Sequence, residues 1–335
     1  MKANQINQLI SQEAFPDSPG KTELIETHIS WIILSTNYAF KIKKPVQFSF
    51  LDFSTLEKRK YYCEEELSLN RRLTLGIYLE VVPITLEKKG KICIDGNGSV
   101  IDYCVQMKRM NNDYRLDKLL REDRVSSEMI FQLAKKLADF HQSTSILSGK
   151  VNSNILLEDF ADILNFQSEI EAVLGKQKMK KIKKGVEFAH QILDRLSSRI
   201  DWREQNGWVR DCHGDLHAAN IIFENEPIIF DCIEFNEHFR YLDLLSELAF
   251  LYMDLDFYNQ GTLAQCFLNK YLETFNCMLT TEDHLLFIFY KLYRANIKVK
   301  VNVLKAKQKE NRNGYQAIVV KVKRYMELFE QYMED

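Results

Sequence analysis

The sequence predicts an α+β protein in which an N-terminal lobe, built on an antiparallel β-sheet with one helix, precedes a mainly helical C-terminal lobe. Two patterns predict this fold class. Between residues 23 and 107, short runs rich in β-branched and aromatic residues alternate with turns of Asn, Gly or charged residues. Beyond residue 111 the apolar residues recur with a helical period. We therefore expect lobes that span residues 1–110 and 111–335.

The individual elements follow from the same patterns. The strands of the sheet are predicted at residues 23–27, 31–36, 38–43, 79–87, 91–95 and 99–107. The one helix of this lobe is predicted over 55–73, where leucines on one side face a dense charged side. In the second lobe, Leu133, Leu137 and Phe140 recur at i, i+4 and i+7 behind a helix start signal at Ser126, which predicts an amphipathic helix.

Composition limits the classes of function. The chain has 335 residues and a formal net charge of -2, so it lacks the basic excess of proteins that bind nucleic acid. Its seven cysteines are odd in number and form no CxxC pair, which is typical of reduced thiols in a cytoplasm. No apolar run reaches the ~18 residues that a membrane span needs, and the N-terminus lacks the apolar core of a signal peptide. We therefore expect a soluble cytoplasmic protein without a nucleic-acid or membrane partner.

Polar residues gather in the segment 207–235, where short strand-like runs alternate with turns. His213-Gly214-Asp215 is followed by Asn220, and Asp231 ends the run Ile228-Ile229-Phe230. Asp215 and Asn220 have the spacing of the aspartate and asparagine in the kinase catalytic loop H-R-D-x-x-x-x-N, and one predicted hairpin separates Asn220 from Asp231. Phosphoryl transfer needs an oriented acceptor hydroxyl and magnesium on the phosphates, and these residue types supply both.

The sequence HGDLHAANI, with IIFDCIEF downstream, resembles the aminoglycoside phosphotransferase family, in which His-Gly-Asp replaces His-Arg-Asp. The segments 38–46, 51–73 and 230–257 are similar to an uncharacterised bacterial branch of that family, and the resemblance covers roughly residues 23–305. It implies a protein-kinase-like fold and an ATP-dependent phosphotransferase that moves the γ-phosphoryl group of Mg-ATP to a hydroxyl of a small molecule.

The resemblance also implies roles for single residues. Asp215 is the expected catalytic base, Asn220 and Asp231 are the expected Mg²⁺ ligands, and Lys41 is the expected partner of the α/β-phosphates of ATP. The glutamate that pairs with this lysine is expected to be Glu66, from the helix that follows.

Two of these assignments have close alternatives. Lys43 shares the face of Lys41 by the period of a strand, and Glu65 adjoins Glu66. Glu66 is preferred because Leu69 and Leu73 follow at i+3 and i+7, which places it on the packed side of the helix.

The sequence departs from the kinase pattern in two places. No G-x-G-x-x-G lies between the first two strands, where residues 26–30 form the turn, so phosphate contacts must come from other backbone and hydroxyl groups. Cys232-Ile233-Glu234 follows Asp231 in place of Phe-Gly, so no regulatory flip is expected. Glu234 either touches the metal or acceptor, or supports residues that do.

Two other hypotheses of function stay open. The missing glycine-rich loop suits a nucleotide-binding pseudokinase with a regulatory role, and the long helical insertion 155–199 suits a kinase that docks a protein and acts on its side chain. Arg294, Lys298 and Lys300 would either line an anionic acceptor pocket or form a solvated basic face, and the charge pattern favours the solvated face. Members of this branch are often fused to a P-loop-containing domain that these residues do not contain, so we expect the protein to act alone or through a separate protein partner.

Overall fold

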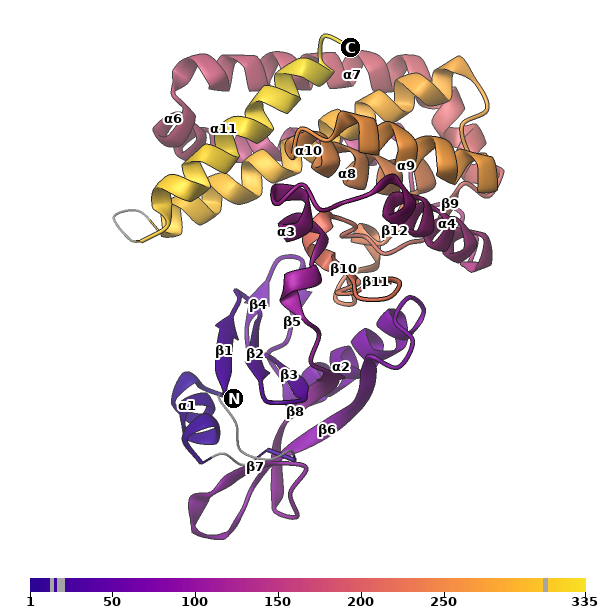
Figure 1. Ribbon diagram of the computed structural model, residues 1–335. Coiled ribbons are helices and arrows are strands. Elements are labelled where there is room, and N and C mark those ends of the chain that lie inside the picture. Colours follow the sequence, from indigo (N-terminus) through magenta and orange to yellow (C-terminus); the bar gives the residue numbers. More distant parts are fainter. Residues whose placement is uncertain (13–14, 17–21, 310–312) are drawn as a thin grey trace. The chain divides into compact units, whose positions relative to one another are not determined.

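The computed structural model describes residues 1–12, 15–16, 22–309 and 313–335 (Figure 1). It divides into two compact units, the first formed by Met1–Arg115 with Asn220–Phe239 and the second by Leu116–Ala219 with Arg240–Asp335. The sequence had predicted a single division after residue 110. The segment Asn220–Phe239 groups with the first unit because its first strand contacts the end of that unit's chain, where Arg115 and Ile222 form an isolated antiparallel bridge.

The first unit is built on a six-stranded sheet in the order β1-β2-β3-β8-β6-β7, and every neighbouring pair is antiparallel. The predicted antiparallel sheet is therefore confirmed. Its strands are β1 (Glu23–Glu26), β2 (Ser30–Leu34), β3 (Tyr38–Lys43), β6 (Tyr78–Leu86), β7 (Ile92–Ile94) and β8 (Ser99–Lys108).

One long helix, α2 (Leu56–Arg71), packs against β6 and β8 of this sheet. It begins where the Thr55 hydroxyl accepts a hydrogen bond from the backbone N–H of Lys58, at 3.2 Å, as an N-cap does. The predicted helix over 55–73 is thus confirmed. The unit also contains α1 (Ala3–Ser11), the hairpins β4 (Gln47–Phe48) with β5 (Leu51–Asp52) and β10 (Ile221–Phe223) with β11 (Pro227–Ile229), and the 3₁₀ turns η1 (Lys88–Gly90), η2 (Asn112–Tyr114) and η5 (Glu237–Phe239).

The second unit is mainly helical, as the sequence predicted. Its helices are α3 (Leu116–Arg121), α4 (Ser127–Ser143), α5 (Ser153–Ala161), α6 (Gln167–Leu174), α7 (Lys176–Gln205), α8 (Leu244–Phe257), α9 (Gly261–Thr274), α10 (Thr281–Gln308) and α11 (Tyr315–Tyr332), with the 3₁₀ turn η3 (Asp162–Phe166). Two short strands, β9 (Val209–Asp211) and β12 (Tyr241–Asp243), pair antiparallel. A further 3₁₀ turn, η4 (Ala218–Asn220), lies between them in the sequence, and its last residue, Asn220, belongs to the first unit.

Helix α8 forms the centre of this unit, because most of its residues on every side are buried. It contacts α9, α10 and α11. At its start, Asp243 caps the helix by accepting from the backbone N–H of Leu245, at 2.8 Å. The same carboxylate binds the fully buried Arg203 at 2.7 and 2.9 Å, and Arg203 also contacts Asp283 at 2.9 Å. This ion-pair network fixes α7, α8 and α10 to one another. None of the described helices combines the length and apolar character that a membrane-spanning helix requires.

Candidate active site

The predicted catalytic loop follows β9 in the helical unit. Gly214 has a φ of 89°, a left-handed conformation that glycine adopts without strain, and the chain turns there into Asp215. The Asp215 side chain is 37% exposed, and its carboxylate lies 3.3 Å from Nε2 of His217. The loop therefore presents a partly solvated carboxylate beside an imidazole.

Surrounding charges keep this carboxylate ionised. Desolvation by the surrounding side chains would raise the pKa of Asp215, but the charge and hydrogen bond of His217, followed by the charges of Lys298 and His213, outweigh it and hold the pKa well below its usual range. An ionised carboxylate can accept a hydroxyl proton. The low pKa makes this carboxylate a weak base.

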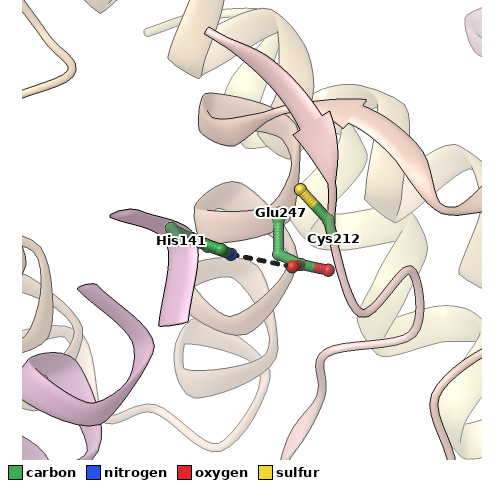
Figure 2. A group of neighbouring side chains, drawn as sticks. All are labelled: His141, Cys212 and Glu247. Carbon is green, nitrogen blue, oxygen red and sulfur yellow. Dashed lines mark hydrogen bonds and ion pairs between the residues drawn. The ribbon is translucent and has the colours of Figure 1, made fainter. Parts of the chain in front are cut away.

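Glu247 of α8 holds the loop from the interior of the unit. Its carboxylate accepts hydrogen bonds from the backbone N–H groups of His213 and Gly214, at 2.8 and 2.7 Å. Nε2 of His141 lies 3.0 Å from the same carboxylate (Figure 2), and Nδ1 of that imidazole lies 2.8 Å from the Tyr271 hydroxyl. Burial raises the pKa of Glu247, but the hydrogen bond and charge of His141 outweigh burial and lower it to about 2.

This network contains side chains of the types that bind metals. Ligand atoms of His141, Cys212 and Glu247 lie within 4.8 Å of one another, and all three side chains are buried (Figure 2). Both ring nitrogens of His141 and both carboxylate oxygens of Glu247 already have partners within the protein. We therefore interpret the group as a hydrogen-bond network that supports the loop.

The first unit brings three other predicted residues together. Nζ of Lys41, on β3, lies 2.6 Å from Oε1 of Glu66, on α2, and 2.6 Å from Oδ1 of Asp231. Lys41 and Glu66 are buried, whereas the Asp231 side chain is 45% exposed. Glu65, the alternative to Glu66, is only half-buried, and within the described residues it forms no ion pair with either lysine of β3.

Lys43 lies on the same side of β3 and completes this charged cluster. Its fully buried ammonium contacts Glu66 at 2.7 Å and also binds Glu234. Burial lowers the pKa of Lys43, but the charges of Glu234 and Glu66 outweigh it and raise the pKa above its ordinary value. Burial also raises the pKa of Glu66, yet the charges of Lys41 and Lys43 lower it to about 2. Glu66 therefore stays ionised as a bridge between the two ammonium groups.

The segment that carries Asp231 is anchored by two residues that the sequence did not indicate. Asp231 has a φ of 65°, and its backbone N–H donates to the Tyr78 hydroxyl at 3.3 Å. The backbone N–H of Cys232 donates to Oδ1 of Asn70, at 2.9 Å. Asn220 lies immediately before β10, and its carbonyl accepts from the backbone N–H of Phe230, at 3.0 Å. The hairpin thus brings Asn220 and Asp231 to its open end.

The turn between β1 and β2 has no glycine-rich loop. The Thr27 hydroxyl accepts from the backbone N–H groups of Ser30 and Ile29, at 2.9 and 3.3 Å, and donates to the carbonyl of Ser30, at 3.1 Å. These two backbone N–H groups donate within the turn itself, so they are not free to donate to a phosphate.

The five predicted residues thus fall into both units. Lys41, Glu66, Asn220 and Asp231 belong to the first unit and Asp215 to the second, and their roles stay predictions. Sequence reasoning missed His141 and Glu247. Weak signals for them exist, because His141 extends the apolar face of α4 and Glu247 is a charged residue within the apolar run Leu244–Leu251.

Residues 113–279 match the family model described as "Phosphotransferase enzyme family". The resemblance to phosphotransferases inferred from the sequence is thereby confirmed. The matched residues contain Asp215, Asn220 and Asp231, whereas Lys41 and Glu66 lie before them. The match supports a phosphotransferase in general terms.

Uncharacterized proteins of Mycobacterium bovis and Mycobacterium tuberculosis are 29% identical to this chain over 292 residues. The alignment covers 84% of this chain and 55% of each relative, so the chain spans about half the length of the curated relatives it matches.

Solved structures are similar over nearly the whole chain. A choline/ethanolamine kinase family protein from Mesorhizobium loti has a TM-score of 0.55 and 12% identity, and covers 97% of this chain and 98% of its own. Choline kinase from Cryptosporidium parvum has a TM-score of 0.54 and 11% identity, and the match covers 99% of this chain and 96% of the choline kinase. The GDP complex of aminoglycoside 2'-phosphotransferase-IIIa has a TM-score of 0.55 and 12% identity, with 100% and 99% covered. At these identities the likeness concerns the fold, and it confirms the predicted protein-kinase-like fold.

Proposed function

We propose that this protein is a kinase that transfers the γ-phosphoryl group of Mg-ATP to a hydroxyl group of a small molecule. The observation that carries the proposal is the pairing of Lys41 with both Glu66 and Asp231, each at 2.6 Å, in a chain that also carries a loop-borne carboxylate at Asp215. A lysine held by a glutamate is the arrangement that positions the phosphates of ATP in kinases.

The donor set fits a hard cation. Asp231 and Asn220 offer carboxylate and amide oxygens, which Mg²⁺ prefers, and the Asp231 side chain is 45% exposed although its Oδ1 binds Lys41. Mg²⁺ bound there would neutralise charge on the phosphates of the nucleotide. The Lys41 ammonium would bind phosphate oxygens, and Glu66 would keep that ammonium in place.

The reaction itself is a displacement at phosphorus. The acceptor hydroxyl oxygen forms a bond to the γ-phosphorus while the bond between that phosphorus and the β,γ-bridging oxygen breaks, which leaves ADP. Asp215 accepts the hydroxyl proton as the new bond forms and then releases it to solvent. Glu247 and His141 contribute by holding the backbone of the Asp215 loop.

The structural neighbours support this class of reaction through their names alone, since they are kinases of choline and ethanolamine and an aminoglycoside phosphotransferase. One of them was solved with GDP, so both ATP and GTP belong in any test of this chain.

The test is release of ADP or GDP by the purified protein in Mg²⁺, with and without an extract of small metabolites, beside the Asp215→Asn variant. We expect extract-dependent release that the variant lacks. Nucleotide binding without release under any of these conditions would argue instead for a nucleotide-binding pseudokinase. Transfer of label only into macromolecules in a lysate would argue for a kinase of protein side chains.

A further inference from the structure

Three lysines of the helical unit, Lys298 and Lys305 on α10 and Lys321 on α11, form what we call the lysine cluster. Within the described residues none of the three has a carboxylate within ion-pair distance. The other lysines of α10 each form an ion pair with a carboxylate. These pairs are Lys291 with Asp335 at 3.5 Å, Lys300 with Asp162 at 2.5 Å and Lys307 with Glu169 at 2.7 Å.

Lys298 lies beside the catalytic loop. Its Nζ is 4.7 Å from the centroid of the Phe250 ring, and the imidazole of His217 lies 5.7 Å from the same ring. His217 in turn contacts the Asp215 carboxylate at 3.3 Å. Lys305 follows Lys298 at i+7 and so shares its face of α10, about 10 Å further along the axis. This face of α10 is therefore directed toward the loop.

Lys321 lies on α11, which packs against α10 (Figure 1). One helical turn beyond it, the Tyr325 hydroxyl donates to Asp254 at 3.3 Å. The other oxygen of Asp254 accepts from the backbone N–H of Ala218, at 2.8 Å, three residues after Asp215.

The positive charges of the cluster act on one another. Desolvation and the charge of Lys298 lower the pKa of Lys305, although the charge of Asp215 opposes this change. Desolvation and the charges of Arg121 and Lys298 lower the pKa of Lys321, although the charges of Asp117 and Asp254 oppose this change. The nearby carboxylates offset only part of the mutual repulsion of these lysines, since the pKa values of Lys305 and Lys321 stay lowered, and a bound anion would relieve the repulsion that is left.

We infer that the lysine cluster is an anion-binding subsite beside Asp215, so that the acceptor is a hydroxy compound that also carries a carboxylate or a phosphate monoester. This assignment of the acceptor rests on the proposed kinase function. Choline, ethanolamine and aminoglycosides, for which the structural neighbours are named, are cations at neutral pH, and three lysines that form no ion pair within the described part of the chain would repel them. Lys300, which the sequence grouped with Lys298, is excluded from the subsite because Asp162 neutralises it.

The reaction at this subsite is the same displacement. The hydroxyl oxygen of the anionic acceptor forms the bond to the γ-phosphorus, the bond to the β,γ-bridging oxygen breaks, and the proton passes to Asp215. The anionic group of the acceptor stays bound to the lysines and is unchanged in the product. The subsite therefore acts on acceptor affinity and orientation.

A binding experiment tests the subsite without any turnover. Inorganic phosphate and glycerate are titrated into the wild-type protein and the Lys298→Met, Lys305→Met, Lys321→Met triple variant, whose folding is checked by circular dichroism and thermal unfolding. Loss of several charged contacts is expected to weaken binding of both anions by at least about tenfold. Lys307→Met, which changes a lysine of the same helix outside the cluster, is the matched control and is expected to bind as the wild type does. Equal affinity in the wild type and the triple variant would overturn the inference.

A kinetic experiment then tests the link to the acceptor. Nucleotide diphosphate release is compared for glycerol, glycerate, glycerol 3-phosphate, choline and ethanolamine, and for six-carbon polyols with the same range of charges. We expect turnover with a carboxylate or a phosphate acceptor, and the choice between those two identifies the source of the anion. In Lys298→Met the KM for that acceptor is expected to rise about tenfold while kcat and the KM for ATP stay within twofold. Turnover with choline or a neutral polyol, or a rise in the KM for ATP alone, would overturn the inference.

The two experiments separate the subsite from the proposed function. Lysine-dependent anion binding without nucleotide turnover on any acceptor would count against the kinase and leave the anion subsite standing. Kinase activity on a cationic acceptor, with no lysine-dependent anion binding, would support the kinase and overturn the anion subsite.

Discussion

The carboxylate of Glu247 binds the backbone N–H of Gly214 at 2.7 Å, immediately before the proposed base Asp215. A second oxygen of the same group binds the backbone of His213 and the imidazole of His141. The position of the Asp215 loop therefore depends on a buried, charged acceptor that itself never touches a substrate. Charged hydrogen bonds of this kind contribute about 1.5–3 kcal/mol each.

Replacement of Glu247 tests this dependence. Glu247→Gln keeps the shape of the side chain but loses its charge, so we expect kcat to fall by about 10- to 100-fold through misplacement of Asp215. The Kd for nucleotide, measured by fluorescence titration, should stay within about threefold, because the ATP-binding residues we propose lie in the other unit. A fall in nucleotide affinity as large as the fall in kcat would point instead to general loss of structure, which circular dichroism detects.

The two lysines of β3 should respond differently to substitution. Lys41 contacts the partly exposed Asp231, so Lys41→Met is expected to weaken nucleotide binding and to lower kcat/KM by at least about 100-fold, with a small effect on stability. Lys43 is fully buried between Glu66 and Glu234. Lys43→Met leaves the buried Glu234 carboxylate without this ion pair and Glu66 with Lys41 alone, which is expected to lower the free energy of unfolding by about 3–5 kcal/mol. Urea denaturation and steady-state kinetics on both variants measure these effects. If Lys43→Met weakened nucleotide binding and Lys41→Met mainly lowered stability, the phosphate contact would belong to Lys43.

Much of the fold follows from local sequence patterns, and much of the site does not. The strands of the sheet and α2 are set by period and capping within single segments, as the hydroxyl of Thr55 at the start of α2 illustrates. The contact between His141 and Glu247 joins residues 106 positions apart, and no local pattern specifies it. The hairpin after Asn220 was predicted, but its grouping with the first unit follows from contacts between residues far apart in sequence, such as the bridge between Arg115 and Ile222 and the hydrogen bond between Cys232 and Asn70.

The environments of the basic residues of α10 also could not be predicted from local sequence patterns. The charge pattern favoured a solvated face for Arg294, Lys298 and Lys300 together, because sequence alone does not reveal counter-ions. In the structure Arg294 is buried and donates to Ser246 at 3.0 Å, Lys300 pairs with Asp162, and Lys298 lies on Phe250. Three neighbouring charges of one helix thus have three different environments.

Metal dependence tests the proposed role of Asp231. Asp231→Asn removes a charged oxygen ligand, so the Mg²⁺ concentration that gives half-maximal activity is expected to rise by about tenfold or more, and chelation with EDTA should abolish the wild-type activity reversibly. Glu237→Gln changes an exposed carboxylate on the same segment and serves as the control, with unchanged Mg²⁺ dependence. An Asp231→Asn variant with wild-type Mg²⁺ dependence would remove Asp231 from the metal site.

Acid should destabilise the helical unit through Asp283. This carboxylate binds Arg199 at 2.9 and 2.7 Å and the buried Arg203 at 2.9 Å. Burial raises the pKa of Asp283, but the hydrogen bond from Arg199 and the charge of Arg203 outweigh it and lower the pKa to about 2. Because the folded pKa lies below the unfolded value of about 3.9, the stabilisation is complete above that value and is lost as the pH falls toward 2.

We expect this carboxylate to contribute about 2 kcal/mol to the free energy of unfolding at neutral pH. Urea denaturation between pH 7 and pH 2.5 measures the contribution. Asp283→Asn should be less stable than the wild type at pH 7, and the difference should shrink as the pH falls, since the wild type then loses the same charge. Glu282→Gln, an exposed neighbour in the first turn of α10, should follow the wild-type curve throughout. A constant difference between Asp283→Asn and the wild type across this pH range would mean that packing, rather than ionisation, explains the effect of the substitution.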